Sequence, residues 1–324
     1  MEEITDKNQE AQFVTTIAEK IKAEMAKVII GQENTIDLML ASLFIGGHVL
    51  LEGVPGIAKT LTAKMLSKAI AVDFSRIQFT PDLMPTDIVG TSIFNLKTSE
   101  FQFKQGPVFS NIILIDEINR SPAKTQAALF ELMEEKQISV DGTTYPMSFP
   151  FMVMATQNPI EQEGTYRLPE AQLDRFLFKI ILEYPNLEEE KEILLRFNND
   201  FNTTVANTVN AVVSAEDIKK CSEIIEQIFI KDDIINYIAQ LVYETRHNGD
   251  LFLGASPRAS LSLLKASKAM AALSGRNFVT PDDVRAVSAA VLNHRIIPSP
   301  EREMEGVTVQ DIIKDIIQKV EVPR

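Results

Sequence analysis

One eight-residue segment constrains the fold more than any other part of the chain: GVPGIAKT, residues 53–60 of 324. It follows a short apolar run, residues 48–52, and precedes a helical pattern over residues 61–71. A glycine-rich loop between a strand and a helix surrounds one point with backbone N–H groups, and the helix N-terminus there favours an anion. The segment therefore predicts an α/β fold with a phosphate-binding loop, or P-loop.

Short apolar runs alternate with helical patterns through the first half of the chain. The runs are residues 48–52, 75–79, 112–115, 151–155 and 178–182. Runs that are apolar on both faces and separated by helices are typical of buried parallel strands. We therefore expect residues 1–188 to form an N-terminal amphipathic helix and a three-layer α/β domain built on a parallel sheet.

The pattern changes after Pro185, where no strong strand run follows. Helix starts are marked instead by capping boxes, in which a carboxylate lies three residues after a hydroxyl. Three such boxes begin at Ser214, Thr280 and Thr308. Residues 189–324 are therefore expected to form an all-helical second domain.

Composition and charge argue against several classes of protein. The formal net charge is −13, whereas nucleic-acid binders usually carry a basic face. The single cysteine, Cys221, permits no intrachain disulfide, and the three histidines share no metal-ligand spacing. The N-terminus is acidic and polar, unlike a secretory signal, and no apolar run reaches the ~18 residues of a membrane helix. We expect a cytoplasmic protein with no transmembrane segment and no nucleic-acid partner.

The P-loop predicts where ATP and Mg²⁺ bind. Lys59 should reach the β- and γ-phosphates, and the Thr60 hydroxyl should ligate Mg²⁺. Ala58 stands where the general pattern has glycine, which is tolerable if its φ is negative. The expected nucleotide-binding residues are Ile30, Gly53, Val54, Pro55, Gly56, Ile57, Ala58, Lys59, Thr60 and Leu61.

Two further strand ends carry polar residues suited to hydrolysis. Four aliphatic residues, 112–115, lead into Asp116 and Glu117, and the run 151–155 is followed by Asn158. Open α/β sheets bind ligands at the carboxyl ends of their strands. We expect Asp116 to hold Mg²⁺ through water, Glu117 to polarise the attacking water, and Asn158 to orient that water.

These features together resemble AAA+ ATPases, and the finer match is to the MoxR family in the helix-2-insert clade. Ala58 is usual in that family, and the match covers most of the chain, from about Ile30 to about Pro298. The segments that carry it are GVPGIAKT (53–60), FTPDLMPTDIVG (79–90), GPVFSNIILIDEINRSPAKTQAALFELMEE (106–135), MATQNPIEQEGTYRLPEAQLDRF (154–176) and SPRA (256–259).

The resemblance implies roles that spacing alone does not. Asn158 is similar to sensor 1, and Arg175 stands where related ATPases carry the arginine finger that reaches the ATP of a neighbouring subunit. Arg258 is similar to sensor 2, and as the second residue of a lid helix it is expected to face the nucleotide held by Lys59 of the same chain. Arg120 and Arg167 are further candidates for contacts between subunits.

Two hairpins are also expected. One pairs residues 92–96 with 100–104, and the other pairs residues 137–140 with 143–147 around the turn signal Asp141-Gly142. They resemble the helix-2 insert and the pre-sensor-1 hairpin of the family, which would face a ring pore or rim and grip a partner. Ordinary surface hairpins are the alternative interpretation.

The resemblance implies a chaperone-like ATPase that forms a homo-oligomeric ring, expected to be a hexamer. MoxR relatives act on client protein complexes, by maturation or metal insertion, often with a partner that carries a von Willebrand factor A domain. Three alternatives remain at this point: a magnesium-chelatase-like motor subunit, a nucleic-acid motor, and a nucleotide-gated scaffold without significant turnover.

Overall fold

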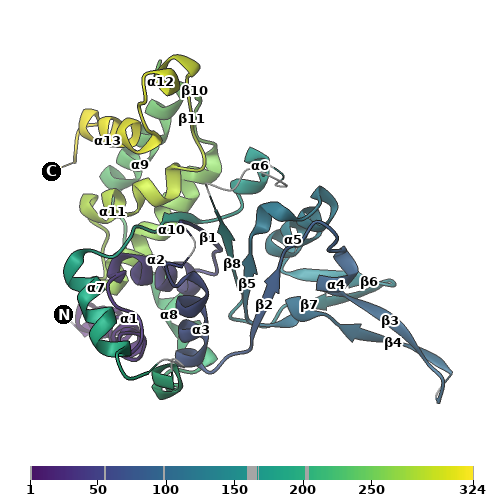
Figure 1. Cartoon of the computed structure of the whole chain (residues 1–324). Helices are drawn as coiled ribbons and strands as arrows, with labels where there is room; N and C mark the ends of the chain where they lie inside the picture. The colour runs from purple at the N-terminus through teal and green to yellow at the C-terminus, as the bar shows by residue number, and fades with distance from the viewer. Residues whose placement is uncertain are drawn as a thin grey trace.

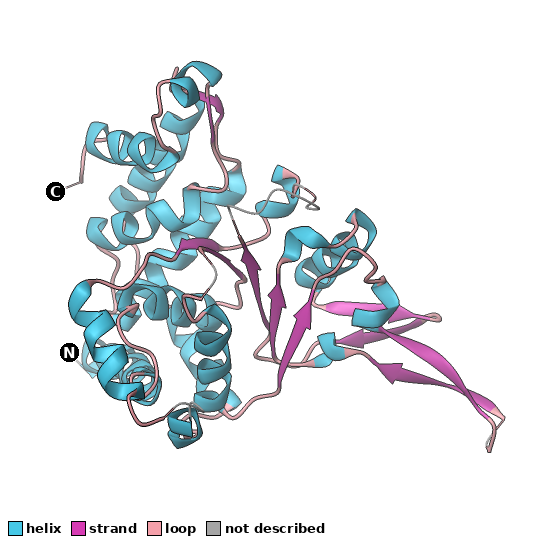
Figure 2. Cartoon of the chain, in the orientation of Figure 1, coloured by secondary structure: helices cyan, strands magenta, loops and turns pink. Residues whose placement is uncertain are grey.

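The computed structural model describes residues 2–54, 56–97, 99–158, 166, 168–200 and 204–323, with side chains from residue 9 onward. Most helices lie on one side of a central sheet, and the β-hairpins extend from the other side (Figure 1, Figure 2). No helix in this described part is long and apolar enough to cross a membrane. Pro55 and Arg167, both singled out above, lie outside the described residues.

A parallel sheet forms the centre of the first domain, as the apolar runs predict. Its strands are β1 (Val49–Glu52), β2 (Phe74–Gln78), β5 (Ile112–Asp116), β8 (Met152–Gln157) and β9 (Phe178–Ile181). They lie in the order β2-β5-β8-β1-β9, and every neighbouring pair is parallel. All carboxyl ends therefore lie along one edge of the sheet, the carboxyl edge, and all amino ends lie along the opposite amino edge.

Alternate strand residues face two separate cores, because successive side chains of a strand point to opposite faces. Ile112 and Leu114 belong to one buried cluster, whereas Ile113 and Ile115 belong to another. The helices that cover the first face are α1 (Glu2–Met25), α2 (Glu33–Phe44) and α3 (Lys59–Ile70). The second face is covered by α5 (Ala123–Glu135), with the short α4 (Pro85–Val89), η1 (Pro107–Phe109) and η2 (Ile118–Arg120). The three-layer prediction is confirmed.

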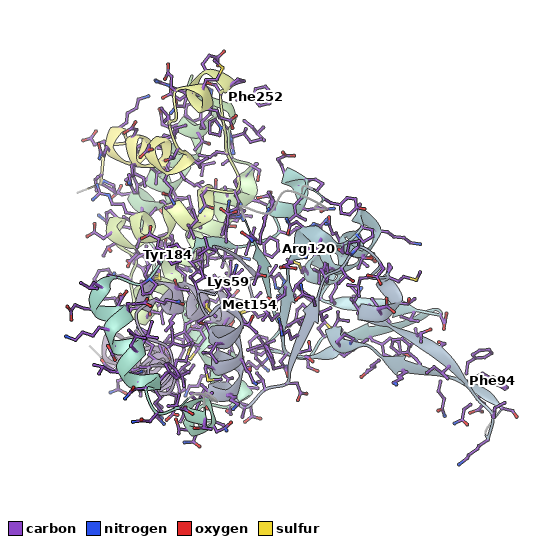
Figure 3. The ribbon with its side chains drawn as sticks, in the orientation of Figure 1. Lys59, Phe94, Arg120, Met154, Tyr184 and Phe252 are labelled. Carbon is purple, nitrogen blue, oxygen red and sulfur yellow. The ribbon has the colours of Figure 1, made fainter. Side chains whose placement is uncertain are left out.

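Both expected hairpins form. They are β3 (Gly90–Asn95) with β4 (Glu100–Gln105), and β6 (Gln137–Val140) with β7 (Thr143–Pro146). Asp141 and Gly142 both have positive φ, 50° and 79°, as a two-residue turn of type I′ requires. The β3–β4 hairpin projects away from the body, and Phe94 lies near its far end (Figure 1, Figure 3).

The second domain is helical, as the capping boxes predict. The boxes at Ser214, Thr280 and Thr308 all form. One short antiparallel ribbon interrupts the helices, because strands of two or three residues leave no alternation that a sequence pattern could reveal. Before β9, the first domain also contains the short α6 (Glu170–Leu173). The elements of the second domain are α7 (Leu187–Phe197), η3 (Thr204–Thr208), α8 (Ala215–Glu226), α9 (Asp232–Arg246), β10 (Leu251–Leu253), α10 (Pro257–Leu273), α11 (Pro281–Leu292), β11 (Ile297–Pro298), α12 (Pro300–Met304) and α13 (Val309–Lys319).

The second domain, called the lid from here on, is anchored on the sheet by the residues that follow α11. The Arg295 side chain is 2% exposed and pairs with Asp174, with 2.6 Å between Nε and Oδ1. It also donates hydrogen bonds to the carbonyls of Phe176 and Leu177, just before β9. Burial lowers the pKa of Arg295, and the Asp174 carboxylate opposes that effect. A buried, fully hydrogen-bonded arginine of this kind holds the lid at one position over the amino edge.

Candidate functional site

The predicted P-loop lies at the carboxyl edge, between β1 and α3. Gly53 is packed so closely that an added Cβ would lie 2.4 Å from the Ile57 side chain. Gly56 has φ of +90°, a conformation that glycine adopts without strain. Lys59 is the first residue of α3, and its Nζ donates a hydrogen bond to the Gly53 carbonyl at 2.8 Å. The loop therefore has the strand–turn–helix geometry that an anion site requires.

The expectation for Ala58 is wrong in one respect: its φ is +59°, not negative. Ala58 is the N-cap residue of α3, and its carbonyl accepts the hydrogen bond from the Thr62 N–H at 2.8 Å. A left-handed backbone costs an L-residue about 1 kcal/mol. The chain therefore holds a strained residue beside its phosphate loop, which sequence spacing alone could not reveal.

A hollow of about 770 Å³ lies beside the P-loop. Five predicted nucleotide-binding residues line it: Ile30, Gly56, Ile57, Ala58 and Leu61. Its far wall is formed by the segment from Ile181 to Asn186 and by α7. The wall combines apolar residues such as Ile30 and Leu61 with polar residues such as Gln32 and Asn34, and this combination and the size suit a purine base with its ribose.

Gln32, which sequence reasoning missed, supplies a polar group to this hollow. Its Nε2 donates a hydrogen bond to the Ile57 carbonyl at 3.2 Å, while its Oε1 is buried and has no hydrogen-bond partner among the residues that the structure describes. A buried acceptor without a partner is costly, so a ligand N–H at this position would be stabilising. Gln32 lies 21 residues before the P-loop in the sequence, and only the tertiary structure brings its side chain to the loop.

The Asp116 carboxylate lies at the end of β5, next to the P-loop. Its Oδ1 accepts a hydrogen bond from the Thr156 hydroxyl at 3.2 Å, and its Oδ2 lies 3.5 Å from the Thr60 hydroxyl. Arg76 pairs with the same oxygen at 2.5 Å. The two predicted Mg²⁺ ligands are thus brought together, and oxygen donors of this type suit Mg²⁺. The described side chains contain no group of three His, Cys, Asp or Glu that could hold a metal, so phosphate oxygens and water would complete the shell.

Glu117 follows Asp116 in a left-handed conformation, with φ of +58°. Its backbone N–H donates to the Thr156 hydroxyl at 3.0 Å. Its carboxylate accepts a hydrogen bond from Gln78 Nε2 at 2.8 Å and pairs with Arg120 Nε at 3.1 Å. Arg120, expected at a subunit contact, therefore binds Glu117 of its own chain in this structure.

Sequence reasoning missed Gln78, Arg76 and Thr156. Each lies beside the acidic pair because of strand register: Gln78 is paired with Asp116, and Arg76 with Leu114. Asn158 comes directly after β8, which lies between β5 and β1 in the sheet, and its side chain is buried. The structure therefore brings Asn158, Asp116, Glu117, Thr60 and Lys59 to one part of the carboxyl edge.

Arg175 and Arg258 lie elsewhere. Both pair with Glu134 of α5: Arg175 through Nη1, and Arg258 through Nη2 at 2.6 Å. Arg175 Nη1 also donates to the Phe130 carbonyl at 2.9 Å. They line a second hollow of about 370 Å³, which shares no lining residue with the hollow beside the P-loop.

This second hollow lies at the amino edge of the sheet. Its wall includes Gly46, Gly47 and His48, which come directly before β1, whereas the P-loop comes directly after β1. A four-residue strand separates the two points by roughly 13 Å. The structure therefore places Arg258 beside Arg175, and not beside the phosphate loop of its own chain as expected.

Comparisons with known proteins agree with this geometry. The model of the ATPase family associated with various cellular activities (AAA) matches residues 48–178, and the AAA lid domain model matches residues 243–316. Chaperone MoxR1 of Mycobacterium tuberculosis (strain ATCC 25618 / H37Rv) is 43% identical over 93% of this chain and 81% of its own. The uncharacterized protein YeaC of Bacillus subtilis (strain 168) is 45% identical over 92% of both chains. A crystal structure from Cytophaga hutchinsonii matches with a TM-score of 0.91 and 43% identity, covering all of both chains.

Proposed function

The chain belongs to the MoxR family of AAA+ ATPases, and on that premise we propose that it is a chaperone-like ATPase whose hydrolytic sites are shared between neighbouring subunits of a ring. One observation carries the proposal: the arginines and the P-loop lie at opposite edges of the same sheet. An ATP held by Lys59 of one chain is out of reach of Arg175 in that chain. This separation supports a role for the arginines at the nucleotide of a neighbouring subunit.

Within one subunit, the carboxyl edge would bind ATP and activate water. Lys59 and the P-loop N–H groups would hold the phosphates, and Thr60 with Asp116 would hold Mg²⁺, which neutralises charge on the phosphate oxygens. Glu117 would accept the proton of the attacking water, and Asn158 would orient that water. Before this can happen, the Glu117 carboxylate must leave Gln78 and Arg120, which hold it in the present structure.

The neighbouring subunit would contribute both arginines. Glu134 brings the two guanidinium groups to a single carboxylate, although one belongs to the sheet domain and the other to the lid. Two cations converging at one point can stabilise the charge that develops on a transferred phosphoryl group. A head-to-tail contact between the two edges, repeated around a closed rotation, forms a ring. The family resemblance supports six subunits.

The hairpins would carry the motion to a client protein. The β3–β4 hairpin exposes Ile93, Phe94, Leu96 and Phe101, and Leu96 at its turn is 86% exposed. Exposed apolar side chains on a projecting element suit contact with another protein. By resemblance, we propose that the client is a protein complex that the ATPase matures, for example by metal insertion. A second protein, which carries a von Willebrand factor A domain, would act together with the ATPase.

Mixing two inactive variants tests the shared site. Arg175→Ala keeps Glu117 but lacks the finger, and Glu117→Gln keeps the finger but lacks the base. Each variant alone should release phosphate very slowly, whereas the mixture should regain a substantial part of the wild-type rate, because one interface combines both intact halves. If the mixture stays as inactive as its components while both variants still assemble with wild type, the shared-site proposal is wrong.

Gln32 supports ATP as the nucleotide. Its buried Oε1 would accept a hydrogen bond from the adenine amino group, which guanine lacks at that position. Gln32→Leu is expected to weaken ATP binding about tenfold, close to the energy of one buried hydrogen bond, with little effect on GTP. Titration of both nucleotides checks this, with the exposed Gln12→Leu on α1 as the matched control. Equal weakening of ATP and GTP would contradict the assignment.

A further inference from the structure

The second hollow carries more positive charge than the two arginines account for. It is lined by five cationic side chains and only two carboxylates, on a chain whose net charge is −13. These charged residues are Lys136, Arg175, Arg258, Lys265, Arg295, Glu134 and Asp174. Arg295 and Asp174 neutralise each other. Glu134 pairs with both Arg175 and Arg258, so the four remaining cations share one carboxylate among the described lining residues, and Lys136 and Lys265 pair with neither carboxylate of the hollow.

Lys265 belongs to the same face of α10 as Arg258. The hollow is lined by Arg258, Leu261, Ser262 and Lys265, which follow the i, i+3, i+4, i+7 spacing of one helical face. Lys265 therefore lies two turns, roughly 10 Å, along the helix from Arg258. In the part of the chain that the structure describes, no ion pair forms at Lys265. Lys265 therefore adds a positive charge to the wall of the hollow.

Lys136 approaches the hollow from the opposite wall. It ends α5 with φ of +49°, and its Nζ donates a hydrogen bond to the Gly46 carbonyl at 3.2 Å. Burial, with Lys265 nearby, lowers the pKa of Lys136. His48 adds no further positive charge, because burial lowers its pKa to about 4 and leaves it neutral near pH 7. Two ammonium groups close together repel each other, and an anion bound between them would relieve that repulsion.

Lys136 is also the base of a hairpin. It is the residue directly before β6, and its carbonyl accepts the hydrogen bond from Met147 N–H, just after β7, at 2.9 Å. Any force on the Lys136 side chain would therefore act at the point where the β6–β7 hairpin joins α5. An anion that binds the Lys136 side chain would therefore act directly on the base of this hairpin.

We propose that Lys136 and Lys265 complete, with Arg175 and Arg258, a binding site for the phosphate chain of the ATP held by the adjacent subunit. The inference rests on the shared site proposed above and extends it by two residues. Lys265 lies farther along α10 than Arg258, so the two cations together would bind oxygens of more than one phosphate group. Loss of the terminal phosphate would then release Lys136 and reposition the β6–β7 hairpin.

This role of the lysines is tested by placing a lysine substitution on one or the other of the two chains in a mixed complex. In the mixture of Arg175→Ala and Glu117→Gln chains, only the second chain presents an intact amino edge to a working site. Lys265→Met or Lys136→Met placed on the Glu117→Gln chain should reduce the phosphate release of the mixture about tenfold at saturating ATP. The same substitution on the Arg175→Ala chain should leave the rate within twofold, because the amino edge of that chain is already inactive.

Two controls separate this role from an effect on folding. Lys268→Met alters the same helix outside the hollow, where Lys268 Nζ donates to the Glu226 carbonyl, and should have no effect on either chain. Lys265→Arg should restore most of the rate, because it keeps the charge. Equal loss on both chains, or no loss on either, overturns the role of the lysines while the shared site stands. An inactive parent mixture instead overturns the shared site, and this inference with it.

Discussion

Glu117→Gln is expected to lower the rate of ATP hydrolysis by about 10²–10⁴-fold while ATP still binds. Glu117 follows Asp116, the proposed Mg²⁺ ligand, and its backbone N–H is hydrogen-bonded to Thr156 at the carboxyl edge. The amide of glutamine keeps the shape and the hydrogen bond to Gln78 but cannot take a proton from water. Phosphate release at saturating ATP, together with an ATP titration, measures both parts of the prediction.

The matched control for this variant is Glu223→Gln, an exposed residue of α8 remote from both hollows. Its rate should equal that of the wild type. A Glu117→Gln protein that hydrolyses ATP at more than a tenth of the wild-type rate would show that another group activates the water. A variant that no longer binds ATP would show that Glu117 has a structural role.

Arg175→Ala is expected to lower the rate by about 10³-fold or more, the usual effect of removing an arginine finger. Its affinity for ATP should stay close to that of the wild type, because Arg175 lies at the amino edge, away from the P-loop of its own chain. The specific activity of the wild type should rise with protein concentration, because each working site needs two subunits. Phosphate release over a hundredfold dilution series measures this dependence.

Arg285→Ala is the control, because Arg285 lies on α11, pairs with the exposed Asp282, and lines neither hollow. Its activity and its concentration dependence should match those of the wild type. The ring mechanism would be wrong if Arg175→Ala hydrolysed ATP at the wild-type rate and the specific activity of the wild type did not depend on protein concentration. The protein would then act as a single-chain nucleotide switch.

Local features of the fold followed from sequence because they depend on neighbours along the chain. The five apolar runs became the five parallel strands, since a buried strand needs apolar side chains on both faces. The capping boxes at Ser214, Thr280 and Thr308 formed, since each needs only a hydroxyl and a carboxylate three residues apart. The Asp141-Gly142 turn formed for a similar local reason.

Part of the candidate site was beyond sequence reasoning, because it depends on register and on packing between distant elements. Gln78 reaches Glu117 only because β2 and β5 are adjacent and in register. The positive φ of Ala58 depends on how the loop enters α3, and its residue type indicated the opposite. Gln32 meets the P-loop because α2 packs beside it.

The sequence by itself determined which side chains are available for chemistry: a P-loop lysine and threonine, an acidic strand end, an asparagine and two arginines. The tertiary structure alone decided how these divide between the two edges of the sheet. In a parallel sheet, the residues that directly follow the strands lie at the carboxyl edge, and the residues that directly precede the strands lie at the amino edge. Arg175, which comes just before β9, therefore lies opposite Lys59, which comes just after β1. Glu134 then draws Arg258 of the lid to the same place, a contact over 124 residues that no local pattern encodes.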